Sequence, residues 1–235
     1  MTNNSIYLRD KEANLTYLIR RPLIETIDPP VIFLLHGTGS NEQDLFSFAE
    51  NLPASFLVIS VRAPFTNSPD SYSWYHVDFS TGKPVINRKQ ADKSRNILLQ
   101  FIAHMQQEYH FDSRKVYLCG FSQGGIMAYS TGLTKPEFIK GIAILSGRIL
   151  EEARSFFASD EKLSHLSVFV AHGTEDNILP VQYAREGLEY MQKRNITPTY
   201  KEYPAGHEIS SDMFSDLLTW LNKNQEDLAP TSVIL

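Results

Sequence analysis

One serine lies between two glycines in a pattern that could support nucleophilic chemistry. Gly120-Phe121-Ser122-Gln123-Gly124 follows the β-forming run Val116–Cys119 and precedes a helix-compatible run. A Gly-x-Ser-x-Gly turn between strand and helix is the sequence form of a nucleophile elbow, which exposes the serine hydroxyl above a sheet. Because five-residue patterns also occur by chance, this interpretation requires a base, an orienting acid and an oxyanion hole.

The base should be a histidine, because a serine hydroxyl is a weak nucleophile and the pKa of imidazole lies near neutral pH. The chain has seven histidines. His207 lies downstream of the serine, in the loop after the last strand-like run, and we predict that it is the base. His172 and His76 are the alternatives, while His36 and His172 could each be a structural imidazole because they end strand-like runs before a glycine.

The orienting acid is expected at the end of the preceding strand-like run. Glu175 and Asp176 are adjacent there, and the turn Asn177-Ile178-Leu179-Pro180 would aim Asp176 inward. We predict that Asp176 orients the histidine; the alternative is that it caps the next helix. The order Ser122, Asp176, His207 is that of α/β-hydrolases and differs from the orders in chymotrypsin and subtilisin.

The oxyanion hole should consist of two backbone N–H groups. Gln123 offers one, because it follows the serine directly at the start of a helix. The other should come from the loop after Val31–Leu35, where Gly37 and Gly39 let the backbone approach a substrate closely. Thr38 is the first choice for this second donor, and Gly39 is the alternative.

Apolar runs alternating with helix-like segments must position these residues. The expected strands are Val31–Leu35, Phe56–Val61, Val116–Cys119, Ile139–Leu145, Leu166–Ala171 and Thr197–Tyr203. Apolar residues at helical spacing predict helices over about 87–109, 181–193 and 210–222. This alternation predicts an α/β fold with a doubly wound, mostly parallel sheet, whose function gathers outside the carboxyl ends of the strands.

The remaining segments refine the expected architecture. Ser5–Arg9 and Asn14–Arg20 predict an antiparallel hairpin at the N-terminus. Residues 150–163 have helical and charged character but are too few for a large cap domain. No repeat or linker divides the chain, so we expect one domain over residues 1–235, with 224–235 as a frayed tail.

A long aperiodic segment, Arg62 to Val85, leaves the carboxyl end of its strand and should overhang the serine. We hypothesise that three of its aromatic residues line the substrate pocket: Phe65, Trp74 and Tyr75. The alternative hypothesis is that these aromatic residues only anchor the loop.

Composition excludes several classes of function. The chain has 42% hydrophobic and 21% charged residues, which is ordinary for a globular domain, and its net charge of −5 offers no basic surface for nucleic acid. Its one cysteine, Cys119, excludes an intrachain disulfide and a cysteine-based zinc site, and we expect no metal site. No signal peptide and no bilayer-length apolar run is visible, so we expect a cytoplasmic protein without integral membrane association.

Five motifs together resemble the phospholipase/carboxylesterase family, which includes acyl-protein thioesterases and small bacterial carboxylesterases. They are His36-Gly37-Thr38-Gly39, Gly120-Phe121-Ser122-Gln123-Gly124-Gly125, Leu145-Ser146-Gly147, His172-Gly173-Thr174-Glu175-Asp176 with Pro180, and Gly206-His207. The resemblance runs from about Val31 to Trp220. It implies an α/β-hydrolase without a large lid, no cofactor, Ser122, Asp176 and His207 as the triad, and Thr38 and Gln123 as oxyanion donors.

The same resemblance implies hydrolysis of carboxylic esters or thioesters. The N-terminal hairpin and the aromatic 62–86 segment are closer to the bacterial esterase branch, and Thr38 stands where many members carry Leu or Tyr. We therefore expect a serine carboxylesterase that cleaves short-to-medium acyl esters through an acyl-enzyme intermediate. A lysophospholipase or acyl-thioesterase is the alternative; a peptidase and a non-catalytic binding module of this fold are remoter ones. The expected partners are a small-molecule ester or thioester and, as one possible assembly, a second copy in a homodimer.

Overall fold

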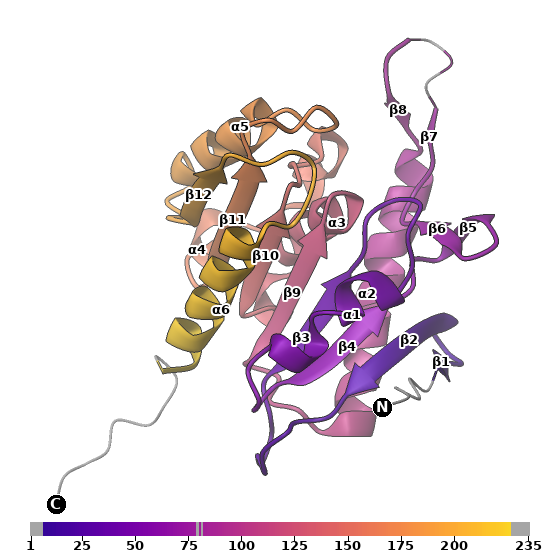
Figure 1. The fold of residues 1–235 in the computed structure, drawn as a ribbon, viewed down its shortest axis with the longest axis vertical. Helices are drawn as coiled ribbons and strands as arrows, with labels where there is room; N and C mark the ends of the chain where they lie inside the picture. Colours follow the sequence, from indigo (N-terminus) through magenta and orange to yellow (C-terminus); the bar gives the residue numbers. More distant parts are fainter. Residues whose placement is uncertain (1–6, 79, 81, 227–235) are drawn as a thin grey trace, which may run out of the picture.

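The computed structural model describes residues 7–78, 80 and 82–226, which form one eight-stranded sheet and two small two-stranded sheets (Figure 1). The large sheet has the order β1-β2-β4-β3-β9-β10-β11-β12. Its strands are β1 (Leu8–Asp10), β2 (Leu15–Arg20), β3 (Val31–Leu35), β4 (Leu57–Val61), β9 (Val116–Phe121), β10 (Gly141–Leu145), β11 (Ser167–Gly173) and β12 (Thr199–Tyr203). Strand β2 pairs antiparallel with β1 and β4, and all pairs from β4 to β12 are parallel. The predicted α/β class, mostly parallel sheet and antiparallel entry hairpin are confirmed.

Helices cover both faces of this sheet. They are α1 (Gln43–Phe46), α2 (Arg88–Tyr109), α3 (Gln123–Thr134), α4 (Asp160–Leu163), α5 (Gln182–Gln192) and α6 (Ser211–Glu226), with short 3-10 helices at Ala49–Asn51, Pro136–Phe138 and Glu151–Phe156. Phe33 of β3 packs in one core cluster with Phe101 of α2, and its neighbour Ile32 packs in the other with Leu217 of α6. Because both faces are buried, β3 is apolar at every position instead of alternating.

The closing helix is longer than the sequence predicts. Helix α6, in front of the sheet in Figure 1, continues to Glu226 instead of ending near Asn222, so the first residues of the expected frayed tail are helical. Hydrogen bonds explain the extension, because Asn224 donates to the Trp220 carbonyl at 2.8 Å and Gln225 accepts from Ser55 at 2.8 Å. Residues 227–235 lie outside the described residues.

The aromatic segment is not one irregular loop. It forms two antiparallel hairpins, β5 (Phe65–Ser68) with β6 (Ser71–Ser73), and β7 (Val77–Asp78) with β8 (Val85–Ile86). These strands have two to four residues, too few for an alternating pattern to reveal them in the sequence. The β7–β8 hairpin projects beyond the carboxyl ends of the parallel strands, at the top of Figure 1.

Cys119 is part of the core on β9, where its side chain is 3% exposed. Burial raises the pKa of its thiol to about 12, so this cysteine stays protonated and packs as a small apolar residue. In the described part of the chain, no helix has both the length and the apolar character needed to span a bilayer.

Candidate active site

Ser122 occupies the tight turn that joins β9 to α3. Its backbone has φ 53° and ψ −118°, which residues other than glycine rarely adopt. A Cβ on Gly124 would lie 1.9 Å from the Leu35 carbonyl oxygen, and one on Gly120 would lie 2.2 Å from the Gly124 carbonyl oxygen. Both positions therefore require glycine, and the strained serine is held at the carboxyl end of β9.

Three side chains from different strand ends form one hydrogen-bonded chain. His207 Nε2 lies 2.9 Å from Ser122 Oγ, and His207 Nδ1 lies 2.7 Å from Asp176 Oδ2. Because a carboxylate only accepts, Nδ1 carries the proton and Nε2 is free to accept from the serine hydroxyl. The structure thus brings together the serine, histidine and acid that the sequence singled out, in an arrangement that lets Nε2 take the serine proton.

Asp176 is held in a turn between β11 and α5. Its Oδ1 accepts from the backbone N–H groups of Ile178 at 2.9 Å and Leu179 at 2.8 Å, and its side chain is fully buried. Helix α5 starts only at Gln182, so these bonds belong to the turn and Asp176 does not cap the helix. The neighbouring Glu175 is exposed.

The two alternative histidines lie elsewhere. His76 is exposed and contacts Gln90. His172 is buried with its Nε2 2.6 Å from the Leu179 carbonyl oxygen and 3.3 Å from Asp176 Oδ2, so Nε2 carries the proton. Burial lowers the pKa of His172, so its imidazole stays neutral beside the Asp176 carboxylate.

The loop after β3 offers one free backbone donor next to Ser122. The Gly39 N–H donates to the Tyr72 carbonyl at 2.8 Å, whereas within the described residues the Thr38 N–H has no acceptor. The Gln123 N–H, at the first position of α3, has no acceptor within its helix. Among the described residues, the N–H groups of Thr38 and Gln123 are thus two unpaired backbone donors that lie beside Ser122.

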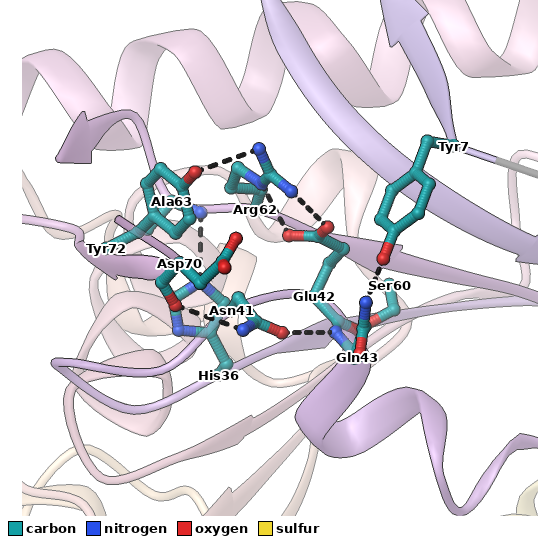
Figure 2. A network of polar contacts seen from close by, with 10 residues as sticks. All are labelled: Tyr7, His36, Asn41, Glu42, Gln43, Ser60, Arg62, Ala63, Asp70 and Tyr72. Atoms are coloured by element: carbon teal, nitrogen blue, oxygen red, sulfur yellow. Dashed lines mark hydrogen bonds and ion pairs between the residues drawn. The ribbon is translucent and has the colours of Figure 1, made fainter. Parts of the chain in front are cut away.

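A polar network holds this loop, residues 36–42, in place (Figure 2). The Ala63 N–H donates to His36 Nε2 at 3.0 Å. Arg62 donates to the buried Glu42 carboxylate through Nε at 2.6 Å and Nη2 at 2.5 Å. Because these bonds tie the loop to the end of β4, the Thr38 N–H is held in place before a substrate arrives.

We predict that the folded protein loses stability in acid, because two of its histidines are buried in the neutral form. Burial lowers the pKa of both His36 and His172, whereas both titrate near pH 6.5 in an unfolded chain. Below that pH the unfolded state binds more protons than the folded state. The free energy of unfolding should therefore fall, for each of the two histidines, by up to ~1.4 kcal/mol per pH unit. Urea unfolding at about pH 7.5 and about pH 5.5 measures this. Equal free energies at the two pH values would contradict it, and the exposed His165→Gln variant should show the same fall as wild type.

The side chain of Gln123 joins the elbow to the aromatic segment. Its Oε1 accepts from the Trp74 N–H at 2.7 Å, and its Nε2 donates to the Tyr75 carbonyl at 2.8 Å. Trp74 is 0% exposed and donates through Nε1 to the His36 carbonyl at 2.9 Å. Trp74 therefore anchors this segment to the loop and the elbow.

We expect Gln123→Glu to lower the free energy of unfolding by about 1–3 kcal/mol, because a carboxylate oxygen would face the buried Tyr75 carbonyl without a proton between them. Urea unfolding gives the value. Gln100→Glu, an equal change at an exposed position on α2, should stay within about 0.5 kcal/mol of wild type. Equal stability of the two variants would show that the Gln123 amide is dispensable.

A cavity of about 210 Å³ opens beside Ser122. It is lined by Thr38, Tyr75, Val77, Pro84, Ile86, Ser122, Gln123, Ile126, Arg148, Ile178, Leu179, Pro180 and Tyr183. Of the three aromatic residues proposed for the pocket, Tyr75 lines this cavity. Trp74 is fully buried and Phe65 lies on β5 near His76, and neither belongs to the cavity wall. Sequence reasoning did not assign three other parts of the cavity wall: Arg148, the residues of the β7–β8 hairpin, and the turn that follows Asp176. Short segments of this kind show no periodic pattern that would mark them.

Comparisons with known proteins agree with this fold. Residues 25–225 match the family model described as Phospholipase/Carboxylesterase. The chain is 26% identical over 219 residues to carboxylesterase SOBER1 of Arabidopsis thaliana, covering 87% of this chain and 94% of that one. It is 26% identical over 209 residues to acyl-protein thioesterase 1 of Kluyveromyces lactis, covering 82% of this chain and 91% of that one. The crystal structure of the Bacillus cereus carboxylesterase has the same fold, with a TM-score of 0.78 at 24% identity over 91% and 96% of the chains. The chain belongs to the phospholipase/carboxylesterase family of α/β-hydrolases.

Proposed function

We propose that this protein is a serine carboxylesterase that cleaves small esters with short-to-medium acyl chains. The observation that carries the proposal is the hydrogen-bonded chain from Ser122 through His207 to Asp176. Its serine lines a cavity together with Thr38 and Gln123, whose backbone N–H groups are unpaired among the described residues. Membership of a family with carboxylesterase and acyl-protein thioesterase relatives supports the same chemistry.

In the first half of the proposed reaction, Ser122 Oγ attacks the ester carbonyl carbon as its proton passes to His207 Nε2. The oxyanion that forms accepts hydrogen bonds from the Thr38 and Gln123 N–H groups. Asp176 stabilises the imidazolium and keeps its ring oriented. His207 then donates the proton to the leaving alcohol oxygen, the carbon–oxygen bond breaks, and the acyl group remains on Ser122.

In the second half, water takes the place of the alcohol. His207 Nε2 accepts a proton from the water as its oxygen attacks the acyl carbon, and the same two N–H groups bind the second oxyanion. The intermediate collapses, His207 returns the proton to Ser122 Oγ, and the carboxylic acid leaves. The side chains described above suffice for every proton transfer.

The cavity favours short over long acyl chains. Its apolar walls include Tyr75, Ile126 and Leu179, and its volume is about 210 Å³. A panel of p-nitrophenyl esters of increasing chain length, with matched thioesters, tests this proposal. We expect kcat/KM to peak among the short-to-medium oxygen esters. A steady rise to the longest chains would favour a lysophospholipase, and a clear preference for thioesters would favour the acyl-thioesterase alternative that the Kluyveromyces relative supports.

A further inference from the structure

The cavity beside Ser122 contains a charge that the proposed reaction does not use. Among the described residues that line it, Arg148 is the one with a formal positive charge, and none is a carboxylate. Most of the other lining residues are apolar, such as Ile126 and Ile178. A cation in such surroundings loses part of its hydration, so it is costly to keep there without a partner.

The protein itself leaves this guanidinium largely unpaired. Arg148 Nη1 donates to the carbonyl of the adjacent Ile149 at 3.3 Å, and Cζ lies 5.4 Å from the centroid of the Tyr183 ring. In the described part of the chain, no carboxylate forms an ion pair with Arg148. The carboxylate of Glu152 pairs with Arg88 instead, at 3.6 Å. Most of the five guanidinium N–H donors are therefore available to a ligand.

Arg148 and Ser122 follow the carboxyl ends of two neighbouring strands of the sheet. Arg148 follows β10, the strand next to β9, and the Ser122 N–H donates to the carbonyl of Leu145, the last residue of β10. The half-buried Arg148 side chain shares the cavity wall with Tyr183 of α5. A cation so placed can reach a group on a substrate whose carbonyl lies at Ser122.

We propose that Arg148 makes the enzyme selective for esters that carry an anionic group, a carboxylate or a phosphate, close to the ester bond. The planar guanidinium fork binds either anion through paired, charge-assisted hydrogen bonds. This inference rests on the proposed esterase function and adds a substrate class to it. The anion can belong to the acid half or to the alcohol half of the ester.

Matched pairs of substrates test the two halves separately. For the acid half, p-nitrophenyl hexanoate is compared with p-nitrophenyl hemiadipate. Their acyl chains have the same length, but the hemiadipate chain ends in a carboxylate instead of a methyl group. For the alcohol half, butyrylglycerol is compared with butyrylglycerol phosphate. Wild type, Arg148→Gln and Arg148→Lys are assayed, with Arg114→Gln, an exposed arginine outside the cavity, as the matched charge control.

We expect Arg148→Gln to lower kcat/KM for at least one anionic substrate by roughly 10-fold or more, while the neutral partner changes by less than about threefold. Arg148→Lys should lose less, because it keeps the charge without the fork. Raising the salt from about 0.05 to 1 M should reduce the wild-type preference. Arg114→Gln should leave both substrates of each pair unchanged.

Which anionic substrate loses activity assigns the anion to one half of the ester. If Arg148→Gln lowered kcat/KM equally for neutral and anionic substrates, or changed it for neither, the role of Arg148 would be overturned. Wild-type hydrolysis of the neutral esters would still support the esterase function in that case. If wild type hydrolysed none of the four esters, the esterase function would fall, and the selectivity with it.

Discussion

Replacing Ser122 by alanine is expected to lower kcat for p-nitrophenyl butyrate by roughly 10⁵- to 10⁶-fold. The hydroxyl 2.9 Å from His207 Nε2 is the nucleophile in the proposed reaction, and alanine removes it without changing the rest of the elbow. Alanine also keeps the Cβ, so the strain at φ 53° is no greater and the fold should remain. Circular dichroism and urea unfolding check the fold, and residual turnover is measured on extensively purified protein.

His207→Ala should cost about as much as Ser122→Ala, and the double variant should cost little more than either. Residues that act as one unit show such strong non-additivity, because removing the base already leaves the hydroxyl inactive. A double variant whose loss equals the product of the single losses would show that the two side chains act independently.

Replacing Asp176 by asparagine is expected to lower kcat by roughly 10⁴-fold with little change in structure. The amide oxygen can still accept from the Ile178 and Leu179 N–H groups, so its NH₂ must face His207 Nδ1. Nδ1 then has to accept, the proton moves to Nε2, and Nε2 can no longer take the proton of Ser122. Steady-state kinetics on the same ester measures the loss.

The neighbouring acid provides the control for Asp176. Glu175 is exposed and lies one residue away, so Glu175→Gln removes the same charge from the same turn. It should keep kcat within about threefold of wild type. A large loss in Glu175→Gln together with near-normal kcat in Asp176→Asn would assign the orienting acid to Glu175.

The predicted strands and their ends agree closely with the structure, and the reason is physical. Runs such as Val31–Leu35 are buried on both faces, so apolar character alone marks them, and polar residues directly after them must lie at the carboxyl edge. That geometry is why Asp176 and His207, 31 residues apart, could be expected to meet.

The cavity wall could not be predicted in the same way. An aromatic residue that anchors a loop and one that lines a pocket have the same sequence signature, so Trp74 could not be distinguished from Tyr75 without the bond from its indole to the His36 carbonyl. Arg148 follows a strand in a non-periodic segment, and only the packing of β10 beside β9 places it near Ser122.

Labelling with a fluorophosphonate probe, followed by mass spectrometry of the peptides, tests the central claim most directly. The account predicts one covalent adduct per chain at Ser122, with much slower labelling in His207→Ala and no adduct in Ser122→Ala. No labelling of the folded wild-type protein, or an undiminished adduct in Ser122→Ala, would contradict it.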